Sequence, residues 1–260
     1  MSDLRQAKAY KLWMKSLGWQ VEKGMFIKKL LGISFIKIQR QKKPMVAFKG
    51  VGIIKLEPAF EDKTDYLKLG FKKDSSPMLP RKTVWLDLKK SEKQLLKEMH
   101  YKTRYNLKRF KEKVKIVRGD KVSNIQLEEF FAIYRKNCKR QKFWGLKFKQ
   151  LKNLVKSFGE KTWLLETDGA GLLVLIHDKV VYYSHNASGQ AGRKIMAPSQ
   201  LVWAAVKLGK NLGCVRFDFE GIDDKLWPGF TRFKKSFGGK EVEYGQPVKK
   251  LFFREGLWPR

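Results

Sequence analysis

The sequence predicts an α+β protein in which a mixed sheet is flanked by helices and a smaller α/β subdomain comes first. Three observations support this. Hydrophobic residues make up 43% and aromatic residues 13% of the 260 residues, enough for a buried core. The main part of the chain alternates strand-like and helical segments. Near residue 80 the sequence also changes, from short strand-like runs to an alternation of strands and helices. We therefore expect a reduced N-terminal subdomain at residues 1–80 and a main domain at residues 81–260.

The N-terminal subdomain contains short runs rich in β-branched and aromatic residues. GISFIKIQR at 32–40 and PMVAFKGVGIIKL at 44–56 predict strands. The Pro- and Ser-containing run KDSSPMLPRK at 73–82 is typical of a connecting loop. This loop is why we place the domain boundary at residue 80.

The main domain opens with a strand and three helices. TVWLDL at 83–88 predicts a strand, and Ser91 followed by Gln94 fits a capping box that begins a helix reaching about Lys113. Apolar residues spaced near 3.6 predict helices at 127–138 and 148–158. One side of the first helix carries the apolar residues Leu96, Met99, Leu107 and Phe110, and another carries a basic stripe of Arg104, Lys108 and Lys111.

Three strands then follow in close succession, at 161–167, 170–177 and 180–188. Asp168-Gly169 and Asp178-Lys179 separate them and resemble hairpin turns. A helix at 199–211, a strand at 214–220, a short helix carrying FKKSF, a Gly238-Gly239 stop and a strand at 249–253 complete the chain. This order matches the acyltransferase architecture known as the GNAT fold.

The charge is strongly positive. Fifty-seven Lys and Arg against 25 Asp and Glu give a formal net charge of +32, which attracts polyanions such as nucleic acid, an anionic membrane face or a pyrophosphate-bearing substrate. A generally lysine-rich composition is the alternative cause. No apolar run approaches the ~20 residues that span a bilayer, and the N-terminal residues form a polar helix instead of a signal peptide. We expect a cytoplasmic protein, with peripheral contact at the inner membrane face left open.

No metal or redox site is expected. Cys138 and Cys214 belong to no CxxC or Cys/His cluster, so both are interpreted as small buried residues. The three histidines lack metal-ligand spacing such as HExxH.

Six segments, in order, resemble the Fem family of transferases, which build the interpeptide bridge of peptidoglycan. They span roughly residues 83–245: TVWLDL with LLKEMHYKTRYNLKRF, NCKRQKF, the run 180–214 beginning VVYYSHNAS, RFDFEGI, GFTRFKKSFGG, and EVEY. Two features depart from the family: only about 80 residues precede the shared region, and the helical arm of some members is absent.

The resemblance implies aminolysis of the ester of an aminoacyl-tRNA by a stem-peptide amine of a lipid-linked or UDP-linked peptidoglycan precursor. Because the ester is already activated, no ATP loop is needed, and no GxxxxGK[ST] motif is present. No cofactor is expected; aminoacyl-tRNA is the co-substrate. The tasks left to the protein are orienting both substrates, neutralising the amine and stabilising the oxyanion.

Lys234 matches the family lysine taken to stabilise charge at the reacting ester, and Phe233 is its matching neighbour. A solvated lysine is the alternative reading. Asp218 matches a characteristic family aspartate that could orient the amine or receive its proton; an ion pair with Arg216 or Lys234 is the alternative. Glu220 does not match the usual family residue, but two-residue spacing would put it on the same strand face as Asp218.

Substrate contacts are expected near the bend from strand to helix. For the precursor's peptide or pyrophosphate these are Tyr182, Tyr183, Ser188 and Arg193, with packing as the alternative for the tyrosines. For tRNA phosphates and bases they are Lys102, Arg104, Tyr105, Lys108 and Lys111, with a solvated helix face as the alternative.

Two other functions remain possible. An N-acyltransferase using acyl-CoA would hold the pyrophosphate on an RxxGxG-like turn, and the equivalent stretch, GRKIMAPSQ, lacks the paired glycines. A non-catalytic basic RNA-binding protein would fit the charge, but no motif such as RGFGFV is present.

Overall fold

The computed structural model describes residues 1–42, 46–48, 50–253 and 256–258. The chain forms two compact units. Unit 1 comprises residues 83–241 with Met1, and unit 2 comprises residues 2–82 and 242–260. The division after residue 82 lies close to the predicted boundary. Residues 242–260, which the sequence assigned to the main domain, instead join unit 2, because strand β14 (Val248–Phe252) pairs with β5 (Val51–Glu57).

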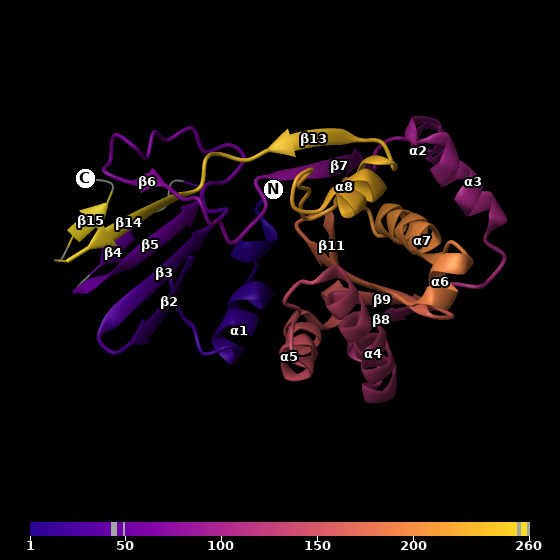
Figure 1. Ribbon diagram of the computed structural model, residues 1–260, viewed down its shortest axis with the longest axis horizontal. Coiled ribbons are helices and arrows are strands. Elements are labelled where there is room, and N and C mark those ends of the chain that lie inside the picture. The colour runs from indigo at the N-terminus through magenta and orange to yellow at the C-terminus, as the bar shows by residue number, and fades with distance from the viewer. Residues whose placement is uncertain (43–45, 49, 254–255, 259–260) are drawn as a thin grey trace. The chain divides into compact units, whose positions relative to one another are not determined.

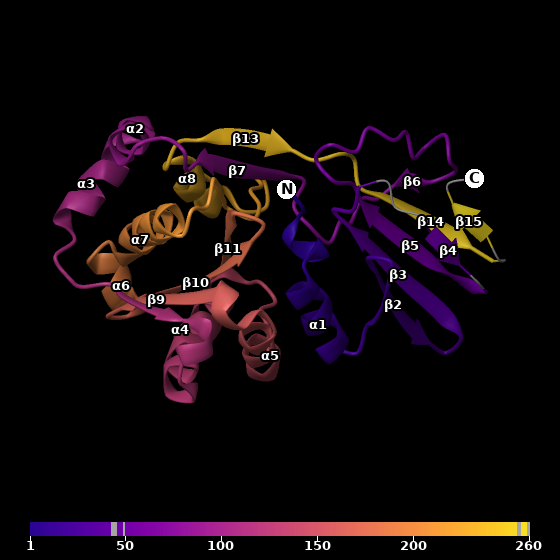
Figure 2. The same ribbon diagram turned by 180° about the vertical axis from the view of Figure 1, so that it is seen from behind.

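Unit 1 is built on a seven-stranded mixed sheet with helices on both faces, as predicted (Figures 1 and 2). In sheet order the strands are β13 (Lys240–Glu243), β7 (Lys82–Asp87), β12 (Arg216–Asp218), β11 (Val180–Ser188), β10 (Ala170–His177), β9 (Thr162–Thr167) and β8 (Lys115–Arg118). β11 and β12 are parallel, whereas β8, β9, β10 and β11 run antiparallel to their neighbours along that side of the sheet.

Helix α7 (Ala197–Asn211) covers one face of this sheet and α4 (Asn124–Gln141) the other (Figure 1). A Cβ on Gly209 of α7 would meet Val181, and a Cβ on Gly171 would meet Phe130 of α4, so both helices approach the strands closely. Helix α5 (Phe148–Phe158) lies beside α4, and the short helices α6 (Gln190–Lys194) and α8 (Pro228–Lys235) also belong to this unit. Its main core gathers Leu86, Val174, Phe217 and Phe237, all at most 1% exposed.

Strands β11 and β12 separate partway along. They pair only from Val180 to Tyr182 on β11, although β11 continues to Ser188 against β10. A bulge opposite Leu173 and Val174 re-aims β11 immediately after this separation. The second half of β11 therefore has β10 but not β12 as its neighbour, which opens the sheet at the end nearest the predicted site.

The helix predicted from 91 to about 113 is two helices. α2 (Glu92–Glu98) begins at the predicted Ser91–Gln94 capping box, and α3 (Tyr101–Arg109) follows a break at Met99 and His100, both extended. The His100 backbone N–H donates to the carbonyl of Ser236, so a contact distant in sequence fixes the break. Lys111 lies beyond α3, and the predicted stripe of Arg104, Lys108 and Lys111 is not formed.

Unit 2 has a six-stranded sheet and one main helix, α1 (Lys8–Ser16). In sheet order the strands are β1 (Gln20–Glu22), β2 (Met25–Leu30), β3 (Ile33–Gln39), β5, β14 and β6 (Lys72–Lys73). A core with Ile36, Ile54 and Phe71 covers one face. The predicted strand 32–40 is confirmed, and the run 44–56 forms β4 (Val46–Phe48), which pairs with β15 (Gly256–Trp258), and β5. Residues 44, 45 and 49 of that run lie outside the described residues.

Across the described ranges, no helix is both long and apolar enough to cross a membrane.

Candidate active site

Three of the segments that resemble the Fem family meet at Lys234. Its side chain extends from α8 and its ammonium donates a hydrogen bond of 2.6 Å to the carbonyl of Gly221, in the RFDFEGI segment. The ammonium also lies 5.3 Å from the centre of the Tyr183 ring. Burial lowers the pKa of Lys234 to about 8, opposed by the negative charges of Glu220 and Asp218. Because an ammonium carries three donors, the Gly221 bond leaves donors for another acceptor.

Asp218 is buried and holds neighbouring segments together. Its Oδ1 accepts hydrogen bonds from Thr83 Oγ1 at 2.6 Å and from the Glu220 backbone N–H at 2.8 Å. Its Oδ2 accepts from Trp85 Nε1 at 2.8 Å. Of the residues proposed as its ion partners, Arg216 lies over the Trp85 ring at 3.8 Å. The geometry thus gives Asp218 a positioning role between β7 and β12 and an electrostatic influence on Lys234.

Glu220 does not lie on the strand. β12 ends at Asp218, and Glu220 and Gly221 both have positive φ angles, 60° and 120°. The expected same-face alternation with Asp218 is therefore wrong, because the chain turns sharply at Glu220. Thr83 Oγ1 accepts a hydrogen bond of 3.2 Å from the Gly221 N–H, which fixes the turn that aims the Gly221 carbonyl at Lys234.

Phe233 and the two tyrosines take different positions around this lysine. Phe233 packs edge-on against Phe237 at the border of the main core, with 5.3 Å between the centres of the two rings. Tyr183 contacts Phe219 and lies beneath the Lys234 ammonium, and burial raises its pKa. Tyr182 is the register partner of Asp218 and points to the opposite face from Tyr183, since successive strand residues alternate.

Ser188 and Arg193 form a separate corner. Ser188 ends β11, five residues and about 17 Å along the strand from Tyr183. The Arg193 guanidinium donates to the Ser188 carbonyl at 2.6 Å. Burial, and after it the positive charge of Arg193, lowers the pKa of Arg140 on α4. Sequence reasoning missed Arg140, although it belongs to the NCKRQKF segment. The predicted substrate residues therefore divide between this arginine corner and the Lys234 site.

The predicted tRNA residues lie on or just after α3. Lys102, Tyr105 and Lys108 are exposed, as is Tyr101 one turn before Tyr105. Arg104 differs: its guanidinium donates to backbone carbonyls at the end of α2, including that of Met99. It thus caps a helix, and its role in phosphate binding is not favoured by this geometry.

A second basic surface extends from the last turns of α4 through the loop that precedes α5. Seven cations and no acid occur in residues 135–149, and within this stretch Trp144 is fully exposed. Cations around an exposed aromatic ring suit phosphates and unstacked bases. Sequence reasoning noted the NCKRQKF segment but not this tryptophan, and exposure is a property that the sequence pattern does not reveal.

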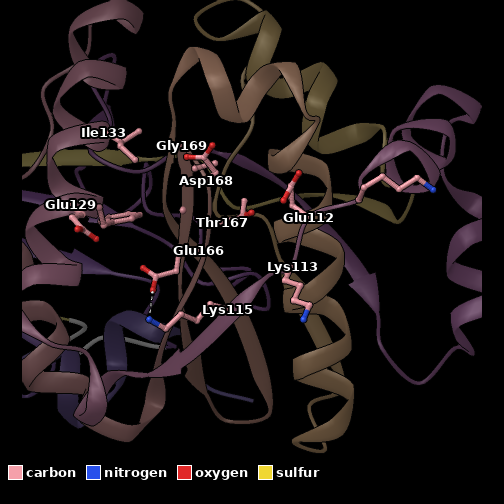
Figure 3. Close-up of a pocket in the computed structure, with 13 residues that line it drawn as sticks. Glu112, Lys113, Lys115, Glu129, Ile133, Glu166, Thr167, Asp168 and Gly169 are labelled. Atoms are coloured by element: carbon pink, nitrogen blue, oxygen red, sulfur yellow. Dashed lines mark ion pairs between the residues drawn. The ribbon is translucent and has the colours of Figure 1, made fainter.

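A cavity of about 770 Å³ opens beside the β9–β10 turn (Figure 3). Its lining combines Glu112, Glu129, Glu166 and Asp168 with three lysines, and Lys115 pairs with Glu166 at 3.4 Å. Lys111 is the predicted site residue that lines it; Lys234 and Asp218 do not. The cavity is therefore distinct from the Lys234 site.

No cluster of three or more His, Cys, Asp or Glu suited to a metal ion occurs among the described residues. His185 lies partly buried against Tyr134, with 5.6 Å between the centres of the two rings, and burial lowers the pKa of His185 to about 4.

Comparisons with known proteins agree with this architecture. Residues 166–253 match the model of the FemAB family. The crystal structure of FemX superposes with a TM-score of 0.73 at 15% identity, covering 96% of this chain and 92% of that one. L-PGS from Bacillus licheniformis gives 0.56 at 11% identity, with coverage of 96% and 92%. A tandem GNAT protein from the clavulanic acid biosynthesis pathway gives 0.50 at 6% identity, with coverage of 87% and 78%. No curated protein matches the sequence. The predicted GNAT-like fold is confirmed.

Proposed function

We propose that this chain, a member of the Fem family with a GNAT-like fold, transfers an amino acid from aminoacyl-tRNA to the stem-peptide amine of a peptidoglycan precursor. The family match supports a Fem-type acyltransferase acting in cell-wall synthesis. The observation that carries the proposal further is Lys234, whose enclosed ammonium is held by the Gly221 carbonyl within segments that resemble those of the family.

In the reaction, the amine nitrogen attacks the ester carbonyl and a tetrahedral oxyanion forms. The bond from carbon to the ribose oxygen then breaks, and that oxygen leaves as a hydroxyl with a proton. The new amide keeps the aminoacyl carbon, and the attacking nitrogen loses a proton. A cation fixed beside the developing oxyanion stabilises this transition state most strongly where water is excluded.

Lys234 meets the requirements of that cation. Its pKa of about 8 keeps it mostly protonated at neutral pH despite its burial. The hydrogen bond to Gly221 fixes the ammonium in place, so that no reorganisation is needed as charge develops. The Tyr183 ring beneath it adds a cation–π contact.

The attacking amine has an ordinary pKa near ~10.4 and must lose a proton. Asp218 is occupied by donors from Thr83, Trp85 and the Glu220 backbone, so we propose that it orients the turn and that the substrates themselves take part in the proton transfer.

The structure also weighs against acyl-CoA as donor. A pyrophosphate would need free backbone N–H groups at the start of α7, but Pro198 there has none and the Ser199 N–H donates to the carbonyl of Met196. The exposed cations and tyrosines of α3 fit tRNA instead.

The test is transfer of label from a pool of radiolabelled aminoacyl-tRNAs to nucleotide-linked or lipid-linked muropeptide. Lys234→Met should lower the rate about 100-fold or more. Lys235→Met is the matched control, because the adjacent Lys235 pairs with Asp224 and Glu241 at the surface and should leave the rate within about threefold of wild type.

Phosphatidylglycerol vesicles and acetyl-CoA complete the design, as an alternative acceptor and an alternative donor. The C-terminal domain of a putative lysylphosphatidylglycerol synthetase from Agrobacterium fabrum shares the fold, with a TM-score of 0.54 at 12% identity over 88% of this chain and 81% of that one. Label moving to the lipid would replace the proposed acceptor, and acetyl transfer would replace the donor. Equal rates for Lys234→Met and wild type would refute the role of Lys234.

A further inference from the structure

Large apolar side chains are exposed together at one end of the unit 2 sheet. Leu30 and Leu31 are 75% and 93% exposed, and Phe253 is 70% exposed. Ile33, Val51 and Leu251 are exposed beside them. We call these six residues the tip patch. Soluble proteins rarely leave so many large apolar residues in one place without a binding partner.

The strand register places the tip patch in one row. Leu30 pairs with Ile33, Ile33 pairs with Val51, and Leu251 pairs with Ile53 two residues further along β5. The four strands concerned are neighbours in the sheet, in the order β2, β3, β5 and β14. The end of β2, the start of β3, the start of β5 and the end of β14 lie along the same side of the sheet in both views (Figures 1 and 2). At the usual spacing between strands the row is about 15 Å wide.

The turn at the centre of the row is unfavourable for the free protein. Leu31 and Gly32 connect β2 to β3 with φ angles of 48° and 78°. A two-residue turn with both φ angles positive favours Asn or Asp at its first position, and a left-handed leucine is strained. Leu31 is thus disfavoured by both conformation and hydration, and its presence is best explained by a partner that buries it.

The surroundings of the tip patch are cationic. Residues 25–39, which form β2, β3 and the turn between them, contain three lysines and no Asp or Glu. Lys28 and Lys29 are exposed directly before Leu30, and the Trp19 ring lies 5.6 Å from the Lys28 ammonium and 4.1 Å from that of Lys37. Lys55 and Lys249, on the same sheet, pair with Asp74 and are excluded from this set.

We propose that the tip patch inserts into the surface of an anionic lipid bilayer, with Lys28 and Lys29 on the headgroups. Apolar side chains at an interface enter the boundary between headgroups and acyl chains, about 5–10 Å deep, and nearby lysines select anionic lipid. A second copy of the chain would bring a like-charged surface against this one. RNA offers no site for aliphatic leucine, isoleucine and valine side chains, since bases bind by stacking on aromatic rings.

The experiment is co-sedimentation of the full-length chain with vesicles. Equal parts phosphatidylglycerol and phosphatidylcholine are compared with phosphatidylcholine alone, at low and raised salt. Leu30→Thr with Leu31→Asn should reduce partition into anionic vesicles about tenfold or more. Lys28→Gln with Lys29→Gln should reduce it about fivefold per lysine and remove much of its salt dependence.

Controls separate binding from folding. Leu31→Asn relieves the turn, so its melting temperature should not fall. Ile125→Thr, which changes an exposed isoleucine of unit 1, and Lys93→Gln with Lys97→Gln on α2 should bind vesicles as wild type does.

Unchanged sedimentation of Leu30→Thr with Leu31→Asn would overturn the proposal. So would equal binding to neutral and anionic vesicles, or a wild-type dimer that this variant dissociates. The vesicle assay needs no transfer activity, and transfer to a nucleotide-linked acceptor should be unaffected by the tip variants, so the two proposals fail independently.

Discussion

At the scale of single residues, Lys234 combines a positive charge with an enclosed position. Burying an ammonium costs folding free energy, and the depressed pKa records that cost. One carbonyl, that of Gly221, and two nearby carboxylates offset part of it. A site that holds a charge against its solvation energy is typical of catalysis and unusual on a merely solvated helix face.

This predicts a pH-dependent difference in stability between wild type and Lys234→Met. The pKa of Lys234 is about 8 in the folded protein against 10.5 when free. Between these values the unfolded chain binds more protons, so the free energy of unfolding of wild type rises with pH across that window. The cost of burial, about 3 kcal/mol, is fully present below pH 8.

Urea unfolding of both proteins at pH 7, 8.5 and 10 measures it. We expect wild type to gain about 1–3 kcal/mol relative to the variant from pH 7 to 10. A difference that stays constant with pH would mean that the ammonium is solvated.

Sequence reasoning named the residues of this candidate site but not their hydrogen-bond partners. Lys234 and Phe233 were named from the GFTRFKKSFGG segment, and both lie on the single helix α8. The network around Asp218 could not be foreseen, because Thr83 and Trp85 lie more than 130 residues away in the chain. Glu220 was misplaced because a positive φ in a non-glycine residue leaves no mark in a hydrophobic pattern.

At the scale of elements, the junction of α2 and α3 joins two segments of the candidate site. His100 donates to the Ser236 carbonyl, and Thr103 Oγ1 donates to Ser236 Oγ at 2.8 Å. Gly238, with a φ of 78°, lies so close to Glu98 that a Cβ would come within 2.8 Å of its carbonyl. The Ser-Phe-Gly-Gly end of the GFTRFKKSFGG segment is thereby explained as a docking site for this junction.

The junction predicts a division of roles on α3. Lys102→Gln with Lys108→Gln should weaken tRNA binding at moderate salt about tenfold without changing stability, since both side chains are exposed. Arg104→Gln should lower stability by about 1–2 kcal/mol through loss of the carbonyl contacts, with tRNA affinity nearly unchanged.

Filter binding and thermal unfolding of these variants decide the matter. The reverse pattern, with Arg104→Gln impairing tRNA binding in a stable protein, would restore Arg104 as a phosphate contact.

Helix propensity alone could not place this break. Residues 91–113 carry apolar residues at a continuous helical spacing and a capping box at the start. Both features are present whether the segment forms one helix or two. What interrupts them is the contact with Ser236, the residue that follows α8, more than 120 residues later in the chain. The strands at 162–188 were predicted closely because short hairpins encode their own register.

At the scale of the whole molecule, the limits of sequence reasoning lie in long-range pairing. The run 249–253 was correctly predicted as a strand, but which sheet it joins depends on β5, almost 200 residues earlier. The assignment of residues 242–260 therefore needed the structure, whereas the boundary near residue 80 followed from local loop composition.

The net charge of +32 leads to a prediction about specificity. At low salt the chain should bind any RNA of tRNA size, because counterion release does not depend on sequence or aminoacylation. Raising the salt weakens this general attraction, while contacts with the ester-linked amino acid at the Lys234 site are largely unaffected. Preference for aminoacylated over deacylated tRNA should therefore grow as salt rises, as measured by binding titrations with both forms and a single-stranded RNA of equal length. The preference should disappear in Lys234→Met, while the slope against salt remains, since one enclosed lysine contributes little to the contact with phosphates. If the three RNAs bound equally at every salt concentration, binding would depend on charge alone, and the Lys234 site would not recognise the ester-linked amino acid.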